Sequence, residues 1–238
     1  MIAGGRAEGR SAHREVSIEA AGATLPGTLT IPKGASGLVL FAHGSGSSRR
    51  SPRNRFVAEV LQSRGIATLL FDLLTGGEES IDEYTAELRF NIPFLASRLA
   101  DATRWAMGDL DTWDLAPCYF GASTGAGAAL VAAAQMPEMI AAVVSRGGRP
   151  DLAGDALGGV RAPTLLIVGG DDEPVIAMNR EALAELQCAE KQLVIVPGAT
   201  HLFEEPGTLE EVARLAGDWF NIHLTGAQQA PQVVRRPQ

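Results

Sequence analysis

The sequence predicts an α/β fold with a mostly parallel central sheet that is covered by helices on both faces. Short continuous apolar runs recur along the chain, and such runs are typical of strands buried on both sides. Segments with apolar residues at helical spacing follow most of these runs. Strands and helices that alternate in this way form parallel sheets. With 46% hydrophobic and 20% charged residues over 238 positions, the chain is long enough to bury a substantial core.

The expected elements begin with an antiparallel hairpin within 15–31, around Gly22. Buried strands are then expected at 37–44, 66–72, 117–123, 140–148, 163–170 and 191–198. Helices are expected at 52–64, 86–107, 124–135, 175–187 and 209–224, with Pro93 interrupting the start of the second. The acidic run of Glu78, Glu79, Asp82 and Glu83 is expected to form a solvated loop.

The domain organisation follows from the absence of a linker and of a repeat with a fixed period. We therefore expect one domain, 1–238, with flexible tails at about 1–13 and 226–238. The segment between the strands at 140–148 and 163–170 is too short for a cap domain, so an open site is expected.

Charge and cysteine content narrow the classes of function. A net charge of −8 argues against a nucleic-acid partner. No apolar run approaches the ~20 residues that span a bilayer, and the N-terminal segment lacks the apolar stretch of a secretory signal. We therefore expect a cytoplasmic protein without membrane contact. Cys118 and Cys188 lie far apart without nearby histidines, so no metal site, disulfide or cofactor is expected.

The predicted nucleophile is Ser123. The segment Gly121-Ala122-Ser123-Thr124-Gly125 matches G-x-S-x-G between a predicted strand and a predicted helix. In that context the serine occupies a strained turn at a helix N-terminus, and side chains at the two glycine positions would collide with neighbouring elements. A glycine-rich turn can instead bind a phosphate. The chain has no GxGxxG and no GxxxxGKS or GxxxxGKT motif, which makes nucleotide binding the weaker alternative.

A serine nucleophile needs a general base, and histidine is the usual choice. His13 lies in the N-terminal segment and His223 near the end of the last predicted helix, so neither is well placed. His43 ends a buried strand but precedes the serine, whereas enzymes with this pattern have the chain order nucleophile, acid, histidine. His201 follows the last strand and satisfies both place and order, so it is the predicted base.

Three candidates for the acid follow the strand at 163–170, namely Asp171, Asp172 and Glu173. A carboxylate there would accept the second imidazole N–H, fix the tautomer and stabilise the imidazolium. Only one of the three can face His201 along an extended turn, and spacing alone does not choose among them.

The glycine-rich segment 43–48 is expected to lie beside the serine turn. One of its backbone N–H groups and that of Thr124 could converge on a tetrahedral oxyanion. Ser45 is the first choice for this donor and Gly46 the second, while His43 is expected to order the loop through hydrogen bonds.

Arginines at the carboxyl edge of the sheet are candidates for binding a substrate carboxylate. Arg146 follows the strand at 140–148 in this way, and a solvated or helix-capping arginine is the alternative reading. Together with His43 and Gly46 of the glycine-rich segment, Arg146 completes the set of candidate substrate contacts.

Four segments together resemble the α/β-hydrolases, and most closely the dienelactone-hydrolase-like subgroup of small bacterial hydrolases without a lid. These segments are LVLFAHGSGSS, GASTGAG, LLIVGGDDEPV and VPGATHLFEEPG, and the resemblance extends from about Arg14 to Leu224. In that family the acid loop reads Gly-x-x-Asp-x-x-Val, which Gly169, Asp172 and Val175 match. The resemblance thus implies Ser123 as nucleophile, Asp172 as acid and His201 as base.

Two features limit what the resemblance implies. Dienelactone hydrolases proper carry a cysteine nucleophile, whereas this chain has Ser123, so dienelactone specificity is not carried over. Sequences that resemble this one are also fused with phosphoribosyltransferases. This chain shows no phosphoribosyltransferase signature, so that activity is not carried over either.

The sequence therefore predicts a serine hydrolase that cleaves small or medium carboxylic esters, or lactones, through a Ser-His-Asp triad and an acyl-enzyme. The alternatives are a non-catalytic α/β-hydrolase scaffold and an acyltransferase or perhydrolase that uses the same triad. The expected partner is a small-molecule ester, and the expected assembly is a monomer or a homodimer.

Overall fold

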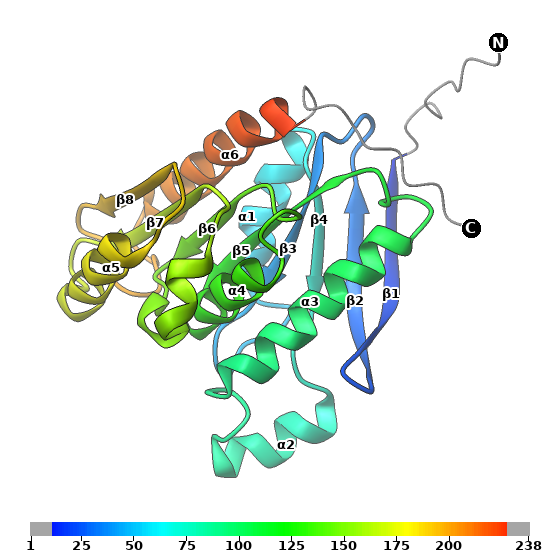
Figure 1. Cartoon of the computed structure of the whole chain (residues 1–238), viewed down its shortest axis with the longest axis horizontal. Coiled ribbons are helices and arrows are strands. Elements are labelled where there is room, and N and C mark those ends of the chain that lie inside the picture. The colour runs from blue at the N-terminus through cyan, green and yellow to red at the C-terminus, as the bar shows by residue number, and fades with distance from the viewer. Residues whose placement is uncertain (1–10, 228–238) are drawn as a thin grey trace.

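The computed structural model of the chain describes residues 11–227. Within this range the chain forms one eight-stranded sheet with the strand order β1-β2-β4-β3-β5-β6-β7-β8 (Figure 1). β1 and β2 form an antiparallel hairpin, β2 joins β4 antiparallel, and every other neighbouring pair is parallel. The predicted α/β fold class, with its mostly parallel sheet and leading hairpin, is confirmed.

The bounds of the elements are as follows. The strands are β1 (Ala12–Ala20), β2 (Ala23–Ile31), β3 (Gly37–Ala42), β4 (Ala67–Phe71), β5 (Ala116–Ala122), β6 (Val143–Arg146), β7 (Thr164–Gly169) and β8 (Lys191–Val196). The helices are α1 (Pro52–Ser63), α2 (Gly76–Thr85), α3 (Ile92–Gly108), α4 (Thr124–Gln135), the 3₁₀ helix η1 (Pro150–Gly159), α5 (Glu173–Glu185) and α6 (Thr208–Ala227).

Two apolar layers sandwich the sheet. α3, α4, η1 and α5 cover one face, and α1 and α6 cover the other (Figure 1). The central strands β3 and β4 are buried along their whole length, which explains why their sequences read as unbroken apolar runs. The parallel strands end at the same edge of the sheet, so their following loops gather there. No helix of the described chain combines the length and the apolarity needed to cross a membrane.

The prediction of a solvated loop at Glu78, Glu79, Asp82 and Glu83 is wrong, because these residues lie in the helix α2. Thr75 and Glu78 form a capping box, in which the Thr75 side chain accepts the Glu78 N–H and the Glu78 carboxylate accepts the Thr75 N–H. Asp82 is buried and accepts hydrogen bonds from the Leu88 backbone and the Arg89 side chain. Caps and charges rather than an apolar stripe define this helix, so apolar periodicity does not reveal it.

Other element boundaries also differ from the prediction. β1 begins at Ala12, so His13 lies in a strand and not in a frayed tail. α3 begins at Ile92, and Pro93 fits its first turn, where a proline costs no helical hydrogen bond. α6 continues to Ala227, which includes the first two positions of the expected C-terminal tail. The remainder of the two expected tails, 1–10 and 228–238, lies outside the described residues.

An ion pair between α2 and α3 predicts a pH-dependent stability. The Glu78 carboxylate accepts hydrogen bonds at 2.6 and 2.7 Å from Arg98, whose side chain is only 1% exposed. This bidentate pairing lowers the pKa of Glu78 to about 2 from an ordinary value of 4.5. A carboxyl whose pKa falls on folding stabilises the native state at any pH above the pKa that it has in the unfolded chain. This contribution is lost as the pH falls from about 4.5 toward 2.

Glu78→Gln should therefore lower the free energy of unfolding by about 2 kcal/mol at pH 7, because it leaves the Arg98 charge without its carboxylate. Urea unfolding of both proteins at pH 7 and at pH 3 measures this difference, which should shrink at the lower pH. Glu87→Gln, at an exposed carboxylate beyond α2 with no ion pair in the described chain, is the matched control. A difference that stays constant with pH would contradict this account of the ion pair.

Candidate active site

Ser123 occupies a strained turn between β5 and α4. Its backbone has φ 51° and ψ −124°, a left-handed conformation that side chains other than glycine rarely adopt. The flanking glycines make this turn possible. A Cβ at Gly121 would overlap the Cα of Ala126, and a Cβ at Gly125 would overlap the carbonyl oxygen of Ala42. The turn therefore presents Ser123 at the carboxyl edge of the sheet and at the N-terminus of α4.

His201 links Ser123 to Asp172. The Nδ1 atom of His201 lies 2.7 Å from Oδ2 of Asp172, and its Nε2 atom lies 3.4 Å from Oγ of Ser123. With the carboxylate accepting from Nδ1–H, Nε2 is left to accept the Ser123 hydroxyl proton. The 3.4 Å separation is long for a hydrogen bond, as is common in sites without substrate.

Asp172 contacts His201, whereas its two chain neighbours, Asp171 and Glu173, point into solvent. Asp171 and Glu173 are exposed, whereas the Asp172 side chain is 13% exposed. The Asp171 backbone N–H donates to the Ala199 carbonyl, which ties this loop to the one that carries His201. Among the three carboxylates that spacing could not separate, Asp172 alone makes the contact.

The other histidines have different surroundings. His13 pairs with Thr30 across the β1–β2 hairpin. His223 packs edge-on against Trp219, with ring centroids 4.6 Å apart, and its side chain is only 8% exposed, so it is largely buried on α6. Burial lowers the pKa of His223. Neither histidine approaches Ser123.

His43 orders the loop after β3, as the sequence predicted. Its Nε2 accepts the Leu73 backbone N–H at 3.0 Å, so the ring proton lies on Nδ1, which donates to the Gly44 carbonyl at 3.0 Å. Desolvation by burial lowers the pKa of His43, which favours this neutral form. The imidazole thus joins the end of β4 to the loop that faces Ser123.

The two expected oxyanion donors lie next to each other. The Thr124 backbone N–H, at the start of α4, has no acceptor among residues 11–227. The Ser45 backbone N–H, however, donates to the Thr124 side-chain oxygen at 3.0 Å. The Ser45 and Thr124 hydroxyl oxygens are also 3.0 Å apart. Sequence reasoning considered only the backbone of Thr124 and missed its side chain.

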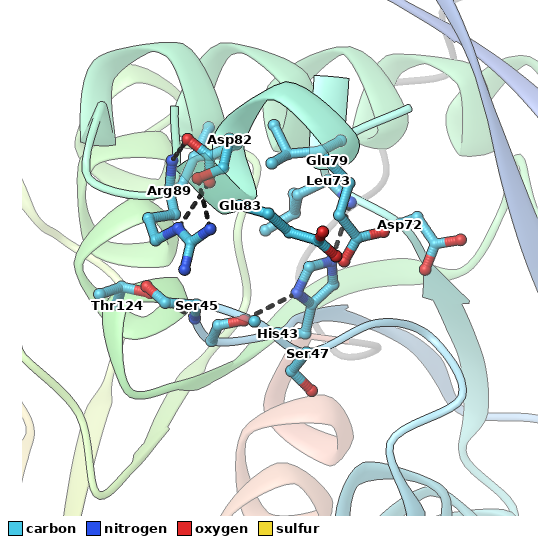
Figure 2. Close-up of a pocket in the computed structure, with 14 residues that line it drawn as sticks. His43, Ser45, Ser47, Asp72, Leu73, Glu79, Asp82, Glu83, Arg89 and Thr124 are labelled. Carbon is cyan, nitrogen blue, oxygen red and sulfur yellow. Dashed lines mark hydrogen bonds and ion pairs between the residues drawn. The ribbon is translucent and has the colours of Figure 1, made fainter. Parts of the chain in front are cut away.

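A cavity of about 120 Å³ lies beside these residues, between α2 and the loop 43–47 that follows β3, here called the oxyanion loop (Figure 2). The loop 43–47 and Thr124 line one side, and Glu79, Asp82 and Glu83 of α2 point toward them from the other. Arg89 reaches the same cavity and is held by Asp82 (Figure 2). Three of the four acidic residues that were expected to form a solvated loop, namely Glu79, Asp82 and Glu83, therefore form a wall of this cavity. Gly46 lies at its edge in a left-handed turn, with φ 65°.

Arg146 lies away from this cavity. Its guanidinium reaches toward Asn54 of α1, with Nη2 at 3.5 Å from Oδ1, and toward the ring of Phe203, 6.0 Å away. Its Nε and Nη1 atoms have no hydrogen-bond partner within the described chain. Burial, together with the charge of Arg53, lowers the pKa of Arg146 to about 10. The expected contact of Arg146 with a substrate carboxylate stays a prediction.

The possible metal ligands and the two cysteines were also located in the described part of the chain. No group of three or more His, Cys, Asp or Glu residues in the described range could hold a metal ion. Cys118 and Cys188 are buried and unpaired, and burial raises the pKa of the Cys118 thiol to about 12. A thiol with so high a pKa is protonated at neutral pH and a poor nucleophile.

Comparisons with known proteins identify the family. No family model matches the chain. Among curated proteins, "Putative phosphoribosyl transferase Rv0571c" of Mycobacterium tuberculosis is 60% identical over 212 residues, which are 89% of this chain and 47% of that protein. The chain thus spans about half the length of the curated relatives it matches.

Solved structures give a fuller match. Est1E from Butyrivibrio proteoclasticus is 18% identical with a TM-score of 0.74, over 89% of this chain and 99% of that one, which shows a shared fold. A crystal structure of dienelactone hydrolase from Anabaena variabilis is 62% identical with a TM-score of 0.87, over 90% of this chain and 98% of that one. Identity of this level across almost the whole of a solved hydrolase, on the same fold, shows that the chain belongs to the dienelactone-hydrolase-like α/β hydrolases.

Proposed function

We propose that this protein is a serine hydrolase that cleaves small or medium carboxylic esters, lactones included, through Ser123, His201 and Asp172. The observation that carries the proposal is the continuous contact from Asp172 through His201 to Ser123, at 2.7 and 3.4 Å. The conformation of Ser123 supports it, because a strained serine at the start of a helix is typical of a nucleophile.

In the proposed reaction, Ser123 Oγ attacks the ester carbonyl carbon while its proton passes to Nε2 of His201. Asp172 holds the imidazole in the tautomer that accepts this proton and stabilises the resulting imidazolium. The tetrahedral intermediate collapses as the bond to the alcohol oxygen breaks, and Nε2 protonates that oxygen. Water then attacks the acyl-enzyme with Nε2 as base, which releases the acid and restores Ser123.

The negative charge that develops on the carbonyl oxygen needs donors. The free backbone N–H of Thr124 at the first turn of α4 supports a role as one donor, and the helix dipole acts in the same direction. The loop around Ser45 lies opposite and is held in place by His43.

The cavity beneath α2 supports a small substrate. Its volume of about 120 Å³ is below the roughly 300–1,000 Å³ of pockets for drug-sized ligands. Apolar side chains of Leu73, Leu74 and Leu95 form part of its wall beside the oxyanion loop. Thr124, the neighbour of Ser123, lines this cavity, whereas Ser123 itself does not. The proposal therefore places a short acyl group in this space, with its carbonyl directed past Thr124 toward Ser123.

Two other activities are weaker candidates. Transfer of the acyl group to an alcohol or to peroxide uses the same three residues, and analysis of products with competing acceptors distinguishes it from hydrolysis. The phosphoribosyl transferase name belongs to a protein of which this chain matches only 47%, whereas this chain matches 98% of a solved dienelactone hydrolase. A monomeric or homodimeric assembly, a cytoplasmic location and the lack of a nucleic-acid or membrane partner stay predictions.

Ser123→Ala should reduce kcat on p-nitrophenyl acetate by about 10⁴-fold or more, because the variant has no nucleophile. The melting temperature should stay close to that of the wild type, since alanine fits the small space at the turn. Ser63→Ala, at an exposed serine at the end of α1, is the control and should keep full activity. Wild-type turnover by Ser123→Ala would refute the proposal.

Asp172→Asn should reduce kcat by about 10⁴-fold, because an amide that donates toward Nδ1 favours the wrong imidazole tautomer. Asp171→Asn and Glu173→Gln change the same charge at the two exposed neighbours and should leave kcat within a few-fold of wild type. Steady-state kinetics on one p-nitrophenyl ester compares the three variants. Equal losses in all three would indicate a general charge effect instead of a specific acid.

The acyl chain length that the enzyme prefers should reflect the cavity. With p-nitrophenyl esters from acetate to decanoate, kcat/KM should fall by about tenfold or more beyond the length that fills it. Leu74→Ala enlarges the cavity and should move this limit to longer chains. An identical chain-length profile in Leu74→Ala would place the acyl group elsewhere.

A further inference from the structure

The side-chain oxygen of Thr124 occupies the acceptor position of the Ser45 N–H, one of the two expected oxyanion donors. An oxyanion sits about 2.7–3.1 Å from each of its donors. Thr124 Oγ1 already lies 3.0 Å from the Ser45 backbone nitrogen and accepts its N–H. While this contact lasts, the Ser45 N–H cannot hold the oxyanion directly.

The peptide that carries this N–H is fixed at both ends. The Gly44 carbonyl and the Ser45 N–H belong to one planar peptide group. His43 Nδ1–H donates to that carbonyl at 3.0 Å, and the ring is held in turn by the Leu73 N–H at 3.0 Å. The peptide therefore cannot turn its N–H toward a substrate without breaking a buried hydrogen bond.

The Thr124 hydroxyl proton, in contrast, can be redirected by rotation about one bond. Because Oγ1 accepts the Ser45 N–H, its own proton is free to donate. At rest the available partner is the Ser45 hydroxyl oxygen, 3.0 Å away, and Thr124 itself is only 4% exposed (Figure 2). The donating hydroxyl belongs to the same residue as the free N–H at the start of α4.

We infer that the Thr124 hydroxyl is itself a catalytic oxyanion donor, acting together with the Thr124 backbone N–H, while the Ser45 N–H polarises the hydroxyl from behind. This inference rests on the proposed serine-hydrolase reaction. As negative charge develops on the substrate oxygen, the hydroxyl turns from Ser45 Oγ to that oxygen. No proton is transferred in this step; a neutral hydrogen bond is exchanged for a charge-assisted one, strengthened by the Ser45 N–H.

The same geometry allows one competing role, in which the hydroxyl only blocks the Ser45 N–H and swings aside when substrate binds. The two roles predict opposite effects when the hydroxyl is removed. A donor that is lost reduces turnover, whereas a blocking group that is lost frees the Ser45 N–H and leaves turnover unchanged or higher.

Thr124→Val keeps the branched shape and removes the hydroxyl, and Thr124→Ser keeps the hydroxyl and removes the methyl group. On p-nitrophenyl acetate, Thr124→Val should lower kcat by about 10²–10³-fold with little change in KM, the usual effect of losing one oxyanion donor. Thr124→Ser should stay within about threefold of wild type. Thr124→Ala removes the hydroxyl and also leaves its place empty, so this variant separates the two roles. Loss of a donor lowers kcat in both Thr124→Val and Thr124→Ala, whereas loss of a blocking group leaves kcat of Thr124→Ala at or above that of the wild type. The melting temperature of each variant checks that it folds.

A trifluoromethyl ketone provides a second measurement, because its serine adduct carries the same oxyanion. Its inhibition constant should rise in Thr124→Val by a factor similar to the loss in kcat. Wild-type or higher kcat in Thr124→Ala would overturn the inference in favour of the blocking role. Equal losses in the valine and serine variants would overturn it in favour of packing by the methyl group. Hydrolysis that survives Ser123→Ala would instead refute the proposed function itself.

Discussion

The close approach of α4 to the end of β3 is the constraint on which the rest of the site depends. The first turn of α4 lies so near the Ala42 carbonyl that only glycine fits at position 125, and Gly121 is required for the same reason on the β5 side. This contact forces Ser123 into its left-handed conformation and places Thr124 against the loop that follows β3. The proposed nucleophile and the proposed oxyanion donors are thus positioned by backbone packing.

Around this contact, two hydrogen-bonded connections fix the remaining groups. One runs from the Leu73 N–H through the neutral His43 ring to the Gly44 carbonyl, and it ties the oxyanion loop to the end of β4. The other joins the Asp171 N–H to the Ala199 carbonyl and brings the acid loop to the loop of His201. Because both connections are buried or partly buried, they hold the reacting groups in place before any substrate arrives.

Sequence patterns predicted the parts of the molecule that apolar burial decides. β3, β4 and β7 are unbroken apolar runs, and the G-x-S-x-G turn between a strand and a helix located Ser123. Chain order then separated His201 from His43. Patterns did not separate Asp172 from its neighbours, because the direction of a side chain on a turn depends on tertiary contacts; the family's acid-loop motif pointed to Asp172, and the structure places it against His201.

The helix α2 and the Thr124 side chain were missed for a related reason. Charged pairs and a capping box define α2, and the Thr75-x-x-Glu78 spacing was the signal in the sequence that could have revealed it. The Thr124 hydroxyl meets Ser45 only because segments 79 positions apart come together in the fold. Spacing along the chain carries no information about such a contact.

The way α2 is attached separates the stability of the core from the shape of the cavity. Asp82 is the one buried residue of this helix, and Ile81 and Tyr84 project into solvent at 64% and 90% exposure. Ionic anchors at Glu78 and Asp82 hold the helix over the cavity, and no residue of α2 belongs to the apolar core on that face of the sheet. Positions between these anchors can therefore change during evolution with little loss of stability. We therefore expect substitutions on this one short helix to reshape the cavity without displacing Ser123, His201 and Asp172.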